Sequence, residues 1–207
     1  MPILLLVIKS RNPPLDLLEK RGDDDQMDEN TSESAVISFR IDGKTKNALE
    51  TECTLQNVSV TSTLNTIVQK HLTWDKFAKE IGLIFISKSI FRNILTKLTD
   101  EEIKVLATTI CRGTLKDATI FMKGELNCKN FIEIVDMWIT NSHIPFRKMV
   151  LENQNTKYVI QHELGMKYST YLFTSIITLL SELGYAATNN RLEDNTLSFE
   201  IYKFNSK

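Results

Sequence analysis

A single predicted strand without a partner in its own segment is the feature that most constrains the fold of this chain. Residues 35–42 alternate between apolar and polar, with Ile37, Phe39 and Ile41 on one side. Two predicted helices follow before residue 76, but no second strand does. One strand and two short helices cannot close a hydrophobic core. We therefore expect an intertwined homodimer, in which two copies form an antiparallel ribbon.

The two helices carry their own start and stop signals. Asp42 or Gly43 can begin the first helix, which extends to about Gln56, and Asn57 tolerates the left-handed conformation of a tight turn. Ser59 can cap the second helix. Apolar residues recur at helical spacing along both helices. With the inward face of the strand, they give an expected dimer core of Ile37, Phe39, Ile41, Leu49, Leu64 and Val68.

Four short stretches follow one another without a gap in this segment. They are Ile37-Ser-Phe-Arg-Ile-Asp42, Ala48-Leu49, Asn57-Val-Ser-Val-Thr-Ser-Thr-Leu64, and Ile67-Val68 to His71-Leu72. In order and spacing they resemble the ribbon-helix-helix family of repressors, over residues 35–74 of a chain of 207. The resemblance implies a homodimer that binds double-stranded DNA and regulates transcription.

The resemblance also implies which side chains contact DNA. In the family the ribbon lies in the major groove and its outward residues read base edges, which by position are Val36, Ser38 and Arg40. Arg40 is the strongest candidate, because a guanidinium can bond bidentately to guanine. The start of the second helix contacts a phosphate, which implies Ser59, Val60, Thr61 and Ser62. Two departures are Asn57, where glycine is common, and Val36, which offers no hydrogen bond to a base.

Charge gives this segment only a weak DNA-binding signature. Residues 35–73 carry four basic and three acidic side chains, a net charge of +1. The alternative interpretation is a dimerisation module without affinity for DNA.

Residues 1–34 carry the opposite charge, with four Lys and Arg against eight Asp and Glu. They are expected to form an acidic disordered tail, because most of the stretch is polar. Translation could instead start at Met27, and an acidic autoinhibitory arm is a further alternative. The apolar run 3–8 is short for a secretory signal and far short of a membrane span. No membrane association is expected.

Residues 80–207 are expected to form an α+β domain with several helices. One helix starts at Thr99 or Asp100, and another covers residues 127–140. Near the C-terminus, a strand at 157–163, a helix at 166–183 and a hairpin of strands 185–191 and 196–204 form a β-α-β-β unit. Its buried residues are expected to be Tyr168, Leu172, Ser175, Ile176, Leu179, Leu183, Leu197, Phe199 and Ile201.

Catalytic and metal-binding patterns are weak throughout. His162-Glu163-Leu164-Gly165 lacks the second histidine of a zinc helix, so a packing histidine is the favoured interpretation. Cys111, Cys128 and His143 match no ligand spacing with His162. There is no Walker loop, G-x-G-x-x-G or G-x-S-x-G motif. We expect neither an enzyme nor a bound cofactor. The three scattered cysteines favour a reducing cytoplasm.

The sequence therefore favours a cytoplasmic transcriptional regulator that acts as a homodimer or a higher oligomer. Its C-terminal domain would sense a small-molecule or protein effector, or add oligomer contacts, by analogy with other regulators. One rival is an antitoxin-like DNA-binding protein whose C-terminal domain binds a partner protein. Another is an enzyme whose N-terminal segment serves only for dimerisation.

Overall fold

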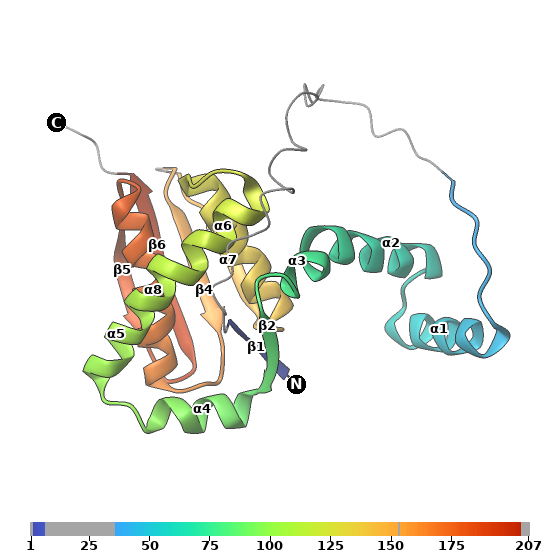
Figure 1. Ribbon diagram of the computed structural model, residues 1–207, viewed down its shortest axis with the longest axis horizontal. Helices are drawn as coiled ribbons and strands as arrows, with labels where there is room; N and C mark the ends of the chain where they lie inside the picture. Colours follow the sequence, from blue (N-terminus) through green and yellow to red (C-terminus); the bar gives the residue numbers. More distant parts are fainter. Residues whose placement is uncertain (1, 7–35, 153, 204–207) are drawn as a thin grey trace. The chain divides into compact units, whose positions relative to one another are not determined.

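The computed structural model describes residues 2–6, 36–152 and 154–203 (Figure 1). The chain divides into two compact units, one made of residues 9–76 and the other of residues 1–8 and 77–207. We call the described residues 36–76 the N-terminal unit, and residues 2–6 and 77–203 the C-terminal unit. The fold mixes helices and sheets, which confirms the α+β class. Among the described helices, none has both the length and the apolar character needed to cross a bilayer.

The N-terminal unit consists of two capped helices and a π-helical turn. They are α1 (Gly43–Gln56), α2 (Val60–Lys70) and η3 (His71–Asp75); α3 (Lys76–Ala78) follows. The caps confirm the predictions: Asp42 accepts from the Thr45 amide at 2.9 Å, and Ser59 accepts from the Ser62 amide at 3.0 Å. Asn57 is left-handed, with φ 54° and ψ 44°. These local bonds set the bounds of both helices.

The predicted strand at 35–42 is not present in the single chain. Residues 36–42 have no assigned secondary structure, and Ala35 lies outside the described residues. A strand requires hydrogen bonds to a neighbouring strand, and within the described part of the chain residues 36–41 have no backbone partner. Asp42, the N-cap of α1, has extended backbone angles, with φ −70° and ψ 155°. The local pattern therefore does not form a strand without a second chain.

A four-stranded antiparallel sheet forms one layer of the C-terminal unit, with the order β3-β4-β6-β5. Its strands are β3 (Phe146–Val150), β4 (Thr156–Gln161), β5 (Tyr185–Leu192) and β6 (Thr196–Lys203). β4 and β5 both pair antiparallel with β6 and are connected through α8 (Met166–Glu182). The predicted β-α-β-β unit is thus confirmed. β3, which extends the sheet by a hairpin with β4, was not predicted.

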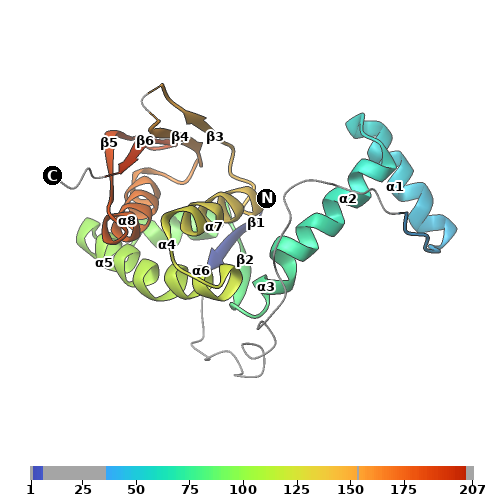
Figure 2. The same ribbon diagram turned by 90° about the horizontal axis from the view of Figure 1, so that it is seen from above.

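Helices cover one face of this sheet (Figure 2). They are α4 (Lys88–Thr96), α5 (Asp100–Ile110), the π-helical turn η4 (Cys111–Leu115), α6 (Lys116–Lys123) and α7 (Cys128–Asn141), together with α8. Of the two predicted starts of α5 the structure has Thr99, which forms a capping box with Glu102, and Asn127 is the N-cap of α7. The predicted buried residues of α8 and β6 are buried except Leu183, which is half-buried.

A second, two-stranded sheet pairs the beginning of the chain with a distant segment. β1 (Pro2–Leu6) runs antiparallel to β2 (Leu83–Ser87), with Leu4 opposite Phe85. Residues 2–6 were predicted to belong to an acidic tail, and this part of the prediction is wrong. The reason is that the partner strand lies far along the sequence. The rest of the predicted tail, including the alternative start at Met27, lies outside the described residues. β2, α4 and α6 were also missed.

Candidate nucleic-acid interface

The candidate base-reading and inward residues before α1 are all exposed in the single chain. Val36, Ser38 and Arg40, predicted to face DNA, make no hydrogen bond or ion pair with the described residues and lie open to solvent. On the predicted inward side, Ile37 is 84% exposed, Phe39 61% and Ile41 43%. Large apolar side chains usually avoid such exposure when they lie side by side. This stretch therefore presents an apolar surface that nothing in the described chain covers.

Further apolar side chains are exposed on α2 and on the turn before it. Val58 and Val68 are about half exposed, as are Ile67 and Leu72. The remaining predicted core residues, Leu49 and Leu64, are half-buried. In the N-terminal unit only Cys53 and Trp74 are buried, and the Cys53 thiol donates to Thr63 Oγ1 at 3.2 Å. The N-terminal unit therefore has capped helices but almost no hydrophobic core.

Four predicted phosphate-binding residues lie together at the start of α2. The Ser59 hydroxyl accepts from the Ser62 amide, so this amide is already satisfied. The amides of Val60 and Thr61 precede the first intrahelical bond, and Ser59, Thr61 and Ser62 are exposed. Two free amides and the positive end of the helix dipole can hold an oxyanion. The geometry is suited to a phosphate, although such helix starts are common.

Charge around these residues is mixed. Arg40, Lys44 and Lys46 are exposed, but Lys46 lies 3.3 Å from Glu50. Hydrogen bonds from Thr45 hold the pKa of Asp42 below its usual value, so this carboxylate adds a negative charge to the same segment. Positive potential is therefore weak on this side of the N-terminal unit, and base contacts would have to contribute much of any sequence preference.

His162, the histidine singled out in the sequence, is a packing residue of the C-terminal unit. It is fully buried, with Nε2 2.8 Å from Ser169 Oγ, and the Leu164 amide donates to Nδ1 at 3.1 Å. Nδ1 must therefore be unprotonated, so Nε2–H donates to Ser169, whose hydroxyl donates to the Glu193 carbonyl at 2.5 Å. Burial lowers the pKa of His162 to about 4. This chain of bonds joins α8 to the turn between β5 and β6.

The other metal and redox candidates are not brought together. No group of three His, Cys, Asp or Glu residues in the described part of the chain could hold a metal ion. Cys111 is buried, and burial raises the pKa of its thiol to about 11, whereas Cys128 is half-buried and its pKa is also raised by burial. A thiol that remains protonated is a poor nucleophile. Nothing in this arrangement supports redox chemistry at either cysteine.

Comparison of the chain with protein-family models, with curated proteins and with solved structures finds no match.

Proposed function

We propose that this protein is a sequence-specific DNA-binding regulator that acts as a homodimer. Residues 36–41 of two copies would pair as an antiparallel β-ribbon and enter the major groove. Ile37, Phe39 and Ile41 would face the four helices of the dimer. Val36, Ser38 and Arg40 would face the bases. The observation that carries the proposal is the exposed apolar, unpaired stretch directly before two capped helices.

Dimerisation would resolve two unfavourable features at once. Pairing with a second copy would satisfy backbone groups of residues 36–41 and cover the three inward side chains. Complete burial of a side chain such as Ile or Phe contributes about 1.5–3 kcal/mol. With three such residues from each copy, the gain is of the same order as the cost of association, about 4–15 kcal/mol. A monomer would leave all of them in water.

DNA binding is supported by the arrangement on the opposite side of the same stretch. In an antiparallel pair, alternate side chains point to opposite faces, so burying Ile37 and Phe39 would turn Ser38 and Arg40 outward. The start of α2 adds amides and hydroxyls suited to a phosphate. Base reading and backbone positioning would then come from two neighbouring parts of each copy.

The C-terminal unit favours a regulator over the antitoxin-like alternative. Antitoxin tails usually become ordered only on binding their partner. The C-terminal unit has instead a closed core of its own, in which Phe131, Leu172 and Phe199 are almost fully buried. By analogy with other regulators, a stable domain of this kind is suited to oligomerisation or ligand sensing.

The proposal is tested by DNA binding of the full chain at several salt concentrations. Fragments from the protein's own promoter and pools of random sequence serve as ligands, with selection and sequencing of the bound DNA. We expect dimeric binding to a palindromic site that weakens steeply with salt. Failure of both the promoter and the random pool to give binding above a scrambled control would refute the proposal.

Substitution at Arg40 sharpens the test. Arg40→Ala should cost about 1–3 kcal/mol of binding and relax base preference at one position of each half-site. Arg40→Lys should also lose preference, because an ammonium cannot make the bidentate contact. The control is Lys104→Ala, which removes an exposed positive charge on α5 of the C-terminal unit. Equal affinity and unchanged base preference in Arg40→Ala would contradict the assignment.

A further inference from the structure

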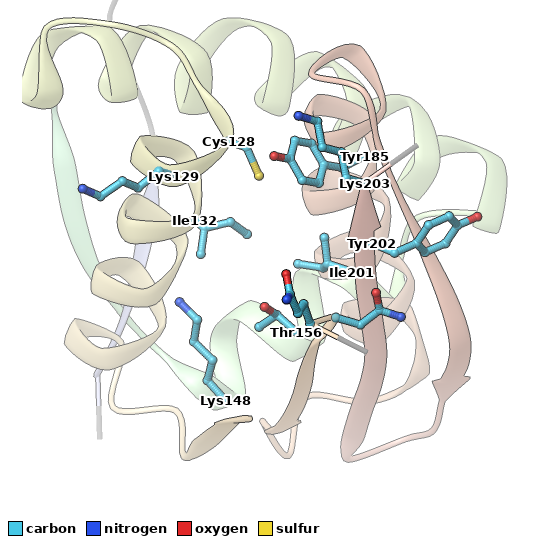
Figure 3. Close-up of a pocket in the computed structure, with 11 residues that line it drawn as sticks. Cys128, Lys129, Ile132, Lys148, Thr156, Tyr185, Ile201, Tyr202 and Lys203 are labelled. Atoms are coloured by element: carbon cyan, nitrogen blue, oxygen red, sulfur yellow. The ribbon is translucent and has the colours of Figure 1, made fainter. Parts of the chain in front are cut away.

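A pocket of about 620 Å³ lies in the C-terminal unit between the start of α7 and the sheet (Figure 3). Its walls come from α7, from the β3–β4 hairpin, and from β5 and β6. This volume falls within the range of small-molecule sites in proteins. All the residues that line it belong to this unit, so its shape does not depend on the N-terminal unit.

The lining of the pocket is positively charged. Lys129, Lys148 and Lys203 contribute to it, and no acidic residue does. Lys148 Nζ bonds Asp136 Oδ2 at 2.6 Å, which uses one of its three donors. For Lys129 and Lys203, no carboxylate of the described residues lies within ion-pair distance. Figure 3 shows the Lys129 ammonium directed away from the open space, so Lys148 and Lys203 supply two ammonium groups against the one carboxylate of Asp136, an excess of one positive charge.

The interior of the pocket has an apolar part beside its polar groups. Figure 3 shows Ile132 of α7 and Ile201 of β6 on opposite sides of the open space, with the Lys148 ammonium directed into it. The Tyr185 ring and the Thr156 side chain also line the space. A ligand that fits these walls has an apolar body to contact the isoleucines and a charged group to meet the lysines.

We propose that this pocket binds a small organic phosphate. A phosphate monoester carries a charge of about −1.5 to −2 at neutral pH, opposite in sign to the net charge of the lining. Its oxygens would accept hydrogen bonds from Lys148 and Lys203, and its apolar body would lie between Ile132 and Ile201. The proposal concerns the C-terminal unit alone and does not rest on DNA binding by the N-terminal unit.

Cys128 provides a direct reporter of occupancy in the full-length protein. Its thiol lies in the pocket wall and is half-buried, whereas Cys53 and Cys111 are buried. Alkylation by N-ethylmaleimide above neutral pH, where more of the thiol is ionised, is followed at each cysteine by peptide mass spectrometry and measures access to the pocket. Phenyl phosphate serves as the probe. Inorganic phosphate lacks the apolar body, benzoate carries a single negative charge, and phenol carries none.

We expect phenyl phosphate to slow alkylation of Cys128, with weaker protection by inorganic phosphate and benzoate and none by phenol. The double variant Lys148→Gln, Lys203→Gln should bind phenyl phosphate about tenfold or more weakly, because charge-assisted contacts are lost. Its control, Lys97→Gln with Lys104→Gln, makes the same charge change on exposed residues that do not line the pocket and should bind normally.

Two results would overturn the proposal. One is an unchanged alkylation rate at Cys128 with millimolar phenyl phosphate. The other is protection by phenol equal to that by phenyl phosphate, or protection that persists undiminished in the pocket double variant. Thermal unfolding of each variant without ligand establishes that a loss of protection reflects lost binding and not a loss of the fold.

Discussion

The two units of this protein differ in how far their large apolar side chains are buried. In the C-terminal unit, Phe131 and Leu172 have no exposed surface. In the N-terminal unit, Phe39 is 61% exposed and Ile37 84%. Helix caps are equally good in both units, since Asp42 and Ser59 cap α1 and α2 as Thr99 caps α5. Well-formed helices therefore do not imply a closed core.

The two units must therefore obtain their stability from different contacts. Capping and helix propensity contribute about 1 kcal/mol for each favourable feature, which does not balance the conformational entropy of ordering a segment. The C-terminal unit obtains the remainder from packing within one chain. The N-terminal unit has to obtain it from a partner, and the exposed face at Ile37, Phe39 and Ile41 is where a second copy would supply it.

The largest expected effect is that of Phe39→Ala on dimerisation. Each dimer loses two aromatic side chains from its proposed core, which should cost about 3–6 kcal/mol of association free energy. Sedimentation equilibrium over a range of concentrations measures the dissociation constant. The control is Val36→Ala, on the outward side of the same stretch, which should leave that constant unchanged. A dissociation constant for Phe39→Ala equal to that of the wild type would show that Phe39 is not part of a dimer core.

Phe131→Ala makes the corresponding change in the C-terminal unit. Removing this buried ring from α7 should lower the free energy of unfolding by about 3–5 kcal/mol. Urea denaturation should show the same loss at every protein concentration, because the residue packs within one chain. A loss that varied with protein concentration would show that the C-terminal core also depends on association.

The C-terminal unit should lose stability as the pH falls below 6.5, because His162 is buried in its uncharged form. Burial lowers the pKa of His162 to about 4 in the folded protein, from 6.5 in an unfolded chain. Between these values the unfolded chain binds the extra proton, so this contribution is complete above pH 6.5 and is lost as the pH falls to 4. The expected loss is about 2–3 kcal/mol.

Urea denaturation at pH 7.5 and at pH 4.5 tests this prediction in the wild type and in two variants. His162→Gln cannot titrate, so its stability should change less between the two pH values. His143→Gln removes an exposed histidine and should behave like the wild type. The same pH dependence in all three proteins would assign the acid sensitivity to other groups.

The smallest expected effect is at the cap of α2. Ser59→Ala removes the hydrogen bond to the Ser62 amide and should lower helix stability by about 1 kcal/mol. Circular dichroism during thermal unfolding would follow this change. Ser59→Asp is the matched variant, since an aspartate also caps a helix but repels phosphate, so it should preserve folding and weaken DNA binding. Unimpaired DNA binding by Ser59→Asp would remove the α2 start from the proposed interface.

Much of the local structure could be predicted from sequence, because it depends on residues three or four positions apart. Asp42, Asn57 and Ser59 take the predicted capping and turn conformations, since a side-chain oxygen reaches only the amides near it. The alternation of Leu197, Phe199 and Ile201 likewise predicted the buried face of β6. The same alternation at Ile37, Phe39 and Ile41 did not form a strand, because no partner strand is present.

Contacts between segments that are distant in the sequence could be seen only in the tertiary structure. The pairing of β1 with β2, the addition of β3 to the sheet, and the convergence of Lys129, Lys148 and Lys203 around a pocket have no local signal. Neither has the bond from His162 to Ser169, which holds α8 to the sheet's end. Helix caps are determined by hydrogen bonds between near neighbours, whereas these arrangements depend on how whole layers pack and which groups burial brings together.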